Sequence, residues 1–192
     1  MQVCASTPTS RRYCRGVTLP ELLLVASILV LLGSTVMPQL ESSRAGRIDL
    51  AASAVANALR FARDESVRTG LRHMVTFDLT SHRIQVAQLT SSGPAPLPLP
   101  LARHPLSRQP YLIDLDDDPS LGASVIAALD LDYESVGSQS VVDFGPAGVP
   151  HYQSLSDSRR LLTGRVRVAL DGLSREILIQ PQTGSVAITG GP

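Results

Sequence analysis

The sequence predicts an α+β fold in which one long amino-terminal helix packs on an antiparallel β-sheet. Three observations predict it. An uncharged run extends from Leu22 to Leu40, directly after the carboxylate of Glu21. Apolar residues then recur at spacings of three and four between Ile48 and Ala62, and short apolar stretches separated by hairpin-type turns fill the carboxyl-terminal part. A helical period followed by a strand period indicates a helix and then antiparallel strands.

The first half of the predicted helix is long and apolar enough to cross a membrane. Residues 17–37 would form about 31 Å of helix at 1.5 Å per residue, which spans the core of a bilayer. Arg11, Arg12 and Arg15 precede this segment, and Arg44 and Arg47 follow it. Because basic residues favour the cytoplasmic side, the small excess ahead of the segment favours a cytoplasmic amino terminus.

The second half of the helix carries one apolar stripe on an otherwise polar surface. The stripe consists of Ile48, Ala52, Val55, Leu59 and Ala62. A stripe of this width predicts a helix that lies on a globular domain. We expect the helix to bend or break near Pro38 and to end at Gly70.

Strand-like stretches follow the helix. Apolar and polar residues alternate over 74–79 and 84–86, around a turn at Ser81-His82. Residues 91–110 hold six of the chain's 14 prolines, so we expect an exposed or partly polyproline loop there. Further short strands are expected at 141–144, 165–170, 176–180 and 185–189, with Asp171-Gly172 and 181–184 as hairpin turns.

The start of the chain closely resembles the prepilin signal of type IV pilins and type II secretion pseudopilins. The resemblance rests on Gly16 after an arginine-bearing leader, on Glu21 five residues later, and on Pro38 in the apolar helix. It implies that a prepilin peptidase cleaves after Gly16 and methylates Val17, and that Glu21 is the acid required for assembly. Val17 stands where Phe is usual, and Pro20 stands where an aliphatic residue is usual. A secretory signal peptide or an ordinary signal anchor is the alternative, although Gly33-Ser34 is a poor cleavage site.

The same resemblance divides the chain into four parts. They are a cleaved leader (1–16), a transmembrane half of the helix (17–37), a periplasmic half of the helix (38–70) and a β-rich globular domain (71–192). Cleavage would remove Cys4 and Cys14, which are both of the cysteines, and would leave 14 arginines against 17 acids. We therefore expect a mature protein with a net charge of −3 and no disulfide.

A second stretch makes the resemblance more specific. Residues 59–70, Leu-Arg-Phe-Ala-Arg-Asp-Glu-Ser-Val-Arg-Thr-Gly, look like a pattern common in GspH-type and FimT-like proteins, with Ser66 where Ala is usual. The expected function is that of a minor pseudopilin, a structural subunit of the periplasmic pseudopilus that drives type II protein secretion. The alternative is a FimT-like minor pilin of a type IV pilus that binds DNA for uptake. Other pseudopilins or minor pilins, the prepilin peptidase and the inner membrane are the implied partners.

The sequence offers no arrangement typical of an enzyme or a metal site. The four histidines lack ligand spacing, and two of them lie in strand or turn surroundings that favour a solvated imidazole. Asp114, Asp116 and Asp118 have the spacing of the first three ligands of an EF-hand. Pro119 and Val125, however, replace the glycine and the glutamate that an EF-hand requires. We expect no enzyme activity and no cofactor. A solvated loop is favoured for the acidic run, and a looser calcium loop stays open.

A short arginine motif is the basis of the alternative function. Gly164-Arg165-Val166-Arg167 resembles the Gly-Arg-x-Arg of DNA-binding FimT-like pilins, in which paired guanidinium groups would contact phosphates. In that subfamily the motif follows the final turn, where this chain has Gly184-Ser185-Val186-Ala187. Arg165 and Arg167 would share one face of a strand. A strand with a polar outer face explains them equally, and the net acidity of the chain predicts no nucleic acid among its partners.

Overall fold

The computed structural model describes residues 19–89, 100–153 and 158–190, with the backbone alone described over 30–43. Helix α1 (Leu19–Thr69) contains 51 residues, and its helical backbone runs through Pro38 without a break. A break at Pro38, one of the two expected outcomes, is therefore contradicted, and a bend there stays a prediction. A proline removes one hydrogen bond from a helix, and the bonds on either side are enough to keep it continuous here. The contacts divide the chain into two units, residues 1–41 and residues 42–192.

The first unit contains the beginning of α1. Its apolar side chains are exposed, and Leu22, Leu23 and Leu24 are 63%, 61% and 60% exposed. Over the residues that the structure describes, no helix has a sufficiently long apolar stretch to cross a membrane. The predicted transmembrane segment, residues 17–37, begins outside the described residues and ends where only the backbone is described.

The second unit places the other half of α1 on the sheet, as predicted. All five residues of the apolar stripe are fully buried, and they belong to one core with strand residues such as Val75, Val86 and Ile177. Burial of a large apolar side chain contributes about 1.5–3 kcal/mol. The helix ends at Thr69, where the N–H of Gly70 donates to the carbonyl of Ser66 (3.0 Å) and Gly70 has a φ of 70°. Glycine adopts this conformation without strain, so the predicted helix end is confirmed.

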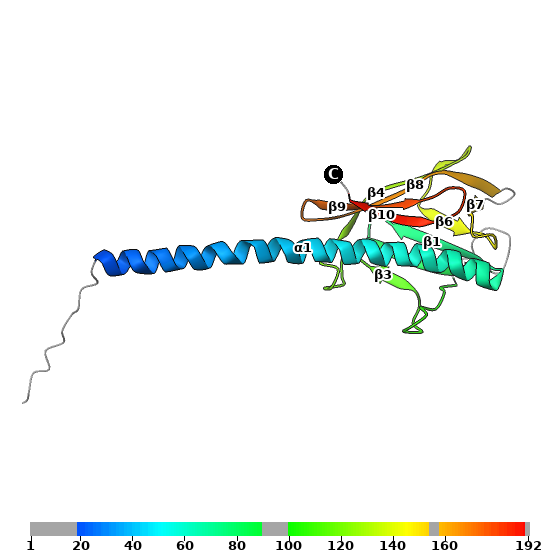
Figure 1. Cartoon of the computed structure of the whole chain (residues 1–192). Helices are drawn as coiled ribbons and strands as arrows, with labels where there is room; N and C mark the ends of the chain where they lie inside the picture. Colours follow the sequence, from blue (N-terminus) through cyan, green and yellow to red (C-terminus); the bar gives the residue numbers. More distant parts are fainter. Residues whose placement is uncertain (1–18, 90–99, 154–157, 191–192) are drawn as a thin grey trace, which may run out of the picture. The chain divides into compact units, whose positions relative to one another are not determined.

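The sheet is antiparallel throughout the described residues, and the order of its main path is β10-β9-β8-β7-β6-β1-β2-β3. Figure 1 shows these strands beside the second half of α1. The fold class is α+β with an antiparallel sheet, as predicted. The strands are β1 (Arg72–Asp78), β2 (Arg83–Leu89), β3 (Leu112–Asp114), β4 (Val125–Tyr133), β5 (Gly137–Ser138), β6 (Val141–Phe144), β7 (Pro150–Gln153), β8 (Ser158–Leu170), β9 (Leu173–Ile179) and β10 (Val186–Gly190).

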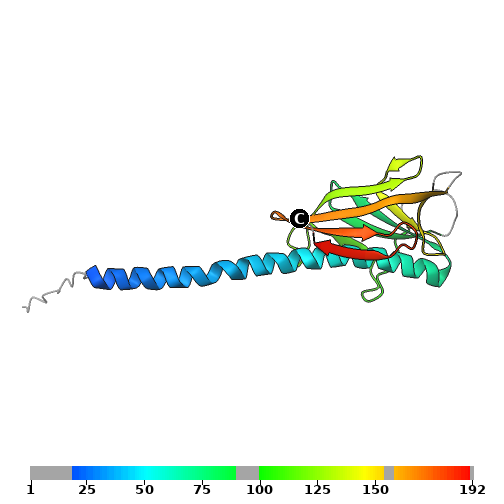
Figure 2. The same cartoon turned by 45° about the horizontal axis from the view of Figure 1, so that its top comes forward.

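Strand β8 is the longest strand and joins two groups of strands. Its first residues, Ser158–Arg160, pair with β7 and through it with β6, β1, β2 and β3. Its remaining residues pair with β4 along one edge and with β9 along the other. Figure 2 shows β8 in orange between the yellow-green β4 and the orange-red β9. Each group therefore depends on the position of this strand.

The structure confirms the strands predicted from alternation and corrects the regions between them. β1, β2, β6 and the three carboxyl-terminal strands lie where they were expected, although β8 begins seven residues earlier than the predicted 165. Strands β3, β4, β5 and β7 were not predicted. Part of the proline-rich segment lies outside the described residues, and most of 101–110 is exposed, as expected. This second half is nevertheless paired with neighbouring residues. Leu101 there bridges Ala87, and Arg103 bridges Pro110.

Candidate functional site

Glu21, the predicted assembly acid, lies in the first turn of α1 and is exposed. Pro20 precedes it in the same turn, where a proline costs little because its missing N–H has no partner within the helix. A carboxylate at this end also interacts favourably with the helix dipole. Gly16 and Val17, the predicted cleavage and methylation site, lie outside the described residues.

Arg165 and Arg167, the predicted DNA contacts, lie in β8 and share one face, as expected. Both side chains converge on Glu176 of the neighbouring strand β9. The distances to Oε1 of Glu176 are 3.6 Å from Nε of Arg165 and 3.5 Å from an Nη of Arg167. Asp130 lines the same shallow hollow of about 190 Å³. The two arginines therefore face two carboxylates of their own domain.

The glycine of the same motif has a role in packing. A Cβ on Gly164 would lie 2.8 Å from Cβ of Ile179 and 2.9 Å from its carbonyl oxygen, which is closer than real Cβ atoms approach. A side chain at this position would push β8 away from the end of β9. The close approach of the two strands explains Gly164 without reference to a ligand.

The pattern at residues 59–70 joins the helix to the last hairpin of the chain. Nε of Arg63 donates to the carbonyl of Thr183 (2.9 Å), and an Nη of Arg60 donates to the carbonyl of Val186 (3.0 Å). Gly184, with a φ of 66°, lies between them, and a Cβ there would collide with the carbonyl oxygen of Gly148. These arginines therefore hold the β9–β10 turn against α1, which the sequence alone did not indicate.

A buried ionic cluster lies at the start of β1. Arg72 pairs with Asp143 of β6, and the Asp143 side chain is only 3% exposed. His73 is 1% exposed, so the expectation of a solvated imidazole is wrong for this histidine. Burial lowers the pKa of His73, because desolvation disfavours the charged imidazolium, and its Nδ1 lies 3.1 Å from the carbonyl of Leu71. The alternation of β1 places His73 toward the interior, and a residue type alone does not reveal that direction.

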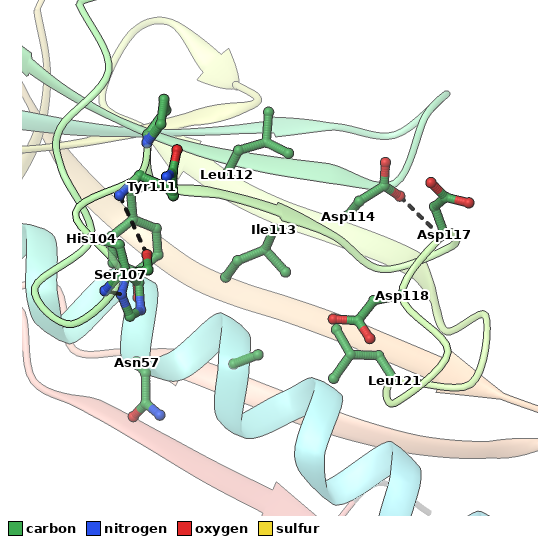
Figure 3. A pocket seen from close by; sticks show the side chains of 13 residues that line it. Asn57, His104, Ser107, Tyr111, Leu112, Ile113, Asp114, Asp117, Asp118 and Leu121 are labelled. Atoms are coloured by element: carbon green, nitrogen blue, oxygen red, sulfur yellow. Dashed lines mark hydrogen bonds between the residues drawn. The ribbon is translucent and has the colours of Figure 1, made fainter.

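The acidic run borders a groove of about 630 Å³ between α1 and the segment 104–121. Figure 3 shows Asp114, Asp117 and Asp118 at one end of this groove and His104 and Ser107 at the other. Asp114 accepts hydrogen bonds from Arg83 (2.5 Å) and from the N–H of Asp117 (3.1 Å), and Asp118 accepts from the N–H of Ser120 (2.9 Å).

These bonds explain the electrostatics of the acidic run. The hydrogen bond from Arg83 is the main cause that lowers the pKa of Asp114, and the bond from the Ser120 hydroxyl is the main cause that lowers the pKa of Asp118. Both carboxylates thus stabilise the local turns of their own loop. In the described part of the chain, no three His, Cys, Asp or Glu side chains gather as metal ligands.

Comparisons with known proteins add one structural likeness. The sequence matches no model of a protein family and no characterised protein. The chain is similar in structure to the minor pseudopilin EpsH from the Type 2 Secretion System of Vibrio cholerae. The TM-score is 0.47 at 12% sequence identity, and the match covers 75% of this chain and 97% of that one.

Proposed function

We propose that this chain is a minor pseudopilin, a membrane-anchored structural subunit of the periplasmic fibre that drives type II protein secretion. In this proposal residues 1–16 are the leader that the prepilin peptidase removes. Residues 17–37 anchor the subunit in the inner membrane, with the amino terminus in the cytoplasm. The domain of residues 71–192 lies in the periplasm and contacts other pseudopilins.

The observation that carries this proposal is the position of Glu21. It stands in the first turn of a helix of 51 residues, directly before the uncharged run that ends at Leu40, and five residues after Gly16. A carboxylate at the edge of a membrane-spanning helix is costly, so it requires a partner. Cleavage after Gly16 would create that partner, because the new amino group of Val17 would lie one helical turn from Glu21.

Processing tests the proposal directly. Co-expression with a prepilin peptidase should shorten the chain by 16 residues and leave a methylated Val17, as read by mass spectrometry of the intact protein. Substitution of Gly16 by a bulky residue should block both changes. An intact Met1 in cells with active peptidase, or cleavage near Gly33, would contradict the proposal.

Glu21→Ala tests the role in assembly. The variant should insert into the membrane at least as well as the native chain, because a buried charge is removed. It should fail to enter the fibre, because the amino group of Val17 would then be buried without its carboxylate partner, which costs several kcal/mol. Normal secretion by a strain that carries only this variant would show that the carboxylate is dispensable.

A FimT-like minor pilin that takes up DNA is the second candidate, and the shared face of Arg165 and Arg167 favours it. The side chain of Arg165 is 49% exposed and that of Arg167 is 42% exposed. A phosphate, however, would compete with Glu176 for both guanidinium groups. We therefore expect weak or no DNA binding at physiological salt.

Salt dependence of DNA binding distinguishes the two candidates. Each lost phosphate contact lowers the log–log slope of affinity against salt by about 0.9 for duplex DNA. Micromolar binding that disappears in the double variant Arg165→Ala, Arg167→Ala would favour the DNA-uptake pilin. Genes for secretion or for pili beside the gene of this chain would decide the same question independently.

A further inference from the structure

A second cavity, of about 520 Å³, adjoins the acidic groove at His104, which lines both. The end of α1, strands β1 and β2, and the hairpin-like segment 101–108 form its walls. All of these elements belong to the unit of residues 42–192.

The lining of this cavity is strongly basic. Arg68 at the end of α1 and both Arg103 and Arg108 of the segment 101–108 are among its lining residues, so three arginines line one cavity. Glu65 is the acidic residue among the lining residues, and it forms its ion pair with Arg68. Among the described residues, no ion pair joins Arg103 or Arg108 to a carboxylate. The cavity therefore has about two positive charges that no carboxylate of its lining neutralises.

Arg103 and Arg108 lie in a turn that is held by backbone hydrogen bonds. The N–H of His104 donates to the carbonyl of Gln109 (2.8 Å), and the N–H of Arg108 donates to the carbonyl of His104 (3.0 Å). Nη of Arg103 donates to the carbonyl of Arg108 (3.2 Å). Arg108 has a φ of 59°, a conformation that side chains other than glycine adopt at a cost.

Aromatic contacts fix the same segment on α1. The ring of Tyr111 stacks on Phe61 with a centroid distance of 4.9 Å, and the ring of His104 lies 4.8 Å from that of Tyr111. Nδ1 of His104 accepts from the N–H groups of Leu106 and Ser107 (3.3 Å each). The turn that carries Arg103 and Arg108 is therefore held in place before any ligand arrives, which lowers the entropy cost of binding.

We propose that this cavity binds an oxyanion, a carboxylate or a phosphate group, through Arg103 and Arg108 with Arg68 as a third contact. Arginine suits such groups because its planar fork donates two parallel hydrogen bonds to two oxygens. This site is distinct from Arg165 and Arg167, whose guanidinium groups already face Glu176. It also does not depend on the function proposed above.

Calorimetric titration of the full-length chain in detergent tests this proposal. Inorganic phosphate and citrate are the two probes, and they distinguish a phosphate ligand from a carboxylate ligand. We expect at least one of them to bind with one-site stoichiometry and to weaken as sodium chloride is added. The double variant Arg103→Gln, Arg108→Gln should weaken that binding at least about tenfold.

Three single variants make the test specific. Glu65→Gln removes the acid that neutralises Arg68 and should tighten anion binding, whereas a variant that merely damaged the domain would not. Arg160→Gln is the matched control, because it removes the same charge from an exposed position that does not line this cavity. It should leave binding unchanged. Arg108→Lys keeps the charge but not the fork, so intermediate binding by this variant supports the proposal even if the double variant fails to fold.

Several results would overturn the proposal. They are absence of binding by both probes, equal binding by the native chain and a folded double variant, and an equal loss of binding in Arg160→Gln. The last result would indicate that anion binding depends only on the net charge of the chain.

Discussion

The two halves of helix α1 share one backbone conformation and differ in the polarity and burial of their side chains. Before residue 42 the described side chains include large leucines that are more than half exposed, and the run from Leu22 to Leu40 has no charge on any side. After residue 42 the helix has a polar surface and one stripe of fully buried residues. A stripe indicates a helix that needs one neighbour, whereas an apolar surface on all sides indicates a helix that needs apolar surroundings everywhere. Each half can therefore be tested by a substitution that the other half should tolerate.

The largest expected effect comes from a matched pair of leucines. Leu59→Ala removes a fully buried side chain from the core and should destabilise the domain by about 2–5 kcal/mol. Leu23→Ala removes an exposed leucine from the same helix and should not change the stability of the domain. Thermal unfolding of the full-length chain in detergent, followed by near-UV circular dichroism, compares them. Equal midpoints would contradict the distinction between the two halves.

The change of folding stability with pH should also come from groups in the second unit, His73 and Glu65. Burial lowers the pKa of His73 below its usual 6.5, so the unfolded chain binds a proton more readily than the folded one. Stability should therefore fall as the pH drops from 7 to 5, since protonation favours the unfolded state. His73→Gln should reduce this loss, as measured by thermal midpoints at both pH values. Glu65 contributes at lower pH, because its lowered pKa stabilises the fold only above its usual 4.5.

A smaller effect is expected from the contact between the helix and the last hairpin. Arg63→Ala removes the hydrogen bond to the carbonyl of Thr183, and its loss should cost about 1 kcal/mol. For a domain of this size that is about 2–4 °C in the unfolding midpoint. Asp64→Ala is the control, because it removes only the exposed ion pair of Asp64 with Arg63 (3.3 Å). Such surface pairs contribute little, so its midpoint should lie near that of the native chain. A larger fall for the control than for Arg63→Ala would be evidence against the contact.

The smallest effect on the unfolding midpoint should come from deletion of the whole first unit. Removal of residues 1–41 should leave the domain folded as a monomer, because the core cluster begins at Ile48. The truncated chain should show the same thermal midpoint as the full-length chain, with or without calcium. A truncated chain that remains unfolded until calcium is added would assign a metal to the Asp114–Asp118 loop and would reverse our interpretation of it.

The parts of the fold that were predictable are those determined by neighbours in the sequence. The helical stripe, the helix end at Gly70 and the hairpin turns of the last three strands all depend on residues within a few positions of each other. Strand β4 was not predicted, because its partner β8 begins 25 residues after β4 ends. Pairing over such a separation is visible only in the folded chain.

The candidate sites show the same limit. Glu21 was singled out from the sequence because its meaning depends on the run of residues after it, and its role stays a prediction. The ion pair of Arg72 with Asp143 and the basic cavity at Arg103 and Arg108 each join residues from distant segments. Even the motif at Gly164 could not be interpreted from its letters, since its glycine is required by Ile179 of another strand.

The shared strand β8 has a consequence for how the domain opens. Val166 and Val168 in this strand are fully buried, and they have neighbours in both β4 and β9. Each of their amide hydrogens can exchange with solvent only when β8 separates from the neighbouring strand that it faces. Complete release of β8 would also remove the partner of β7. Because β8 belongs to both groups of strands, we expect the two groups to open together, so that their slowest-exchanging amides share a single opening free energy.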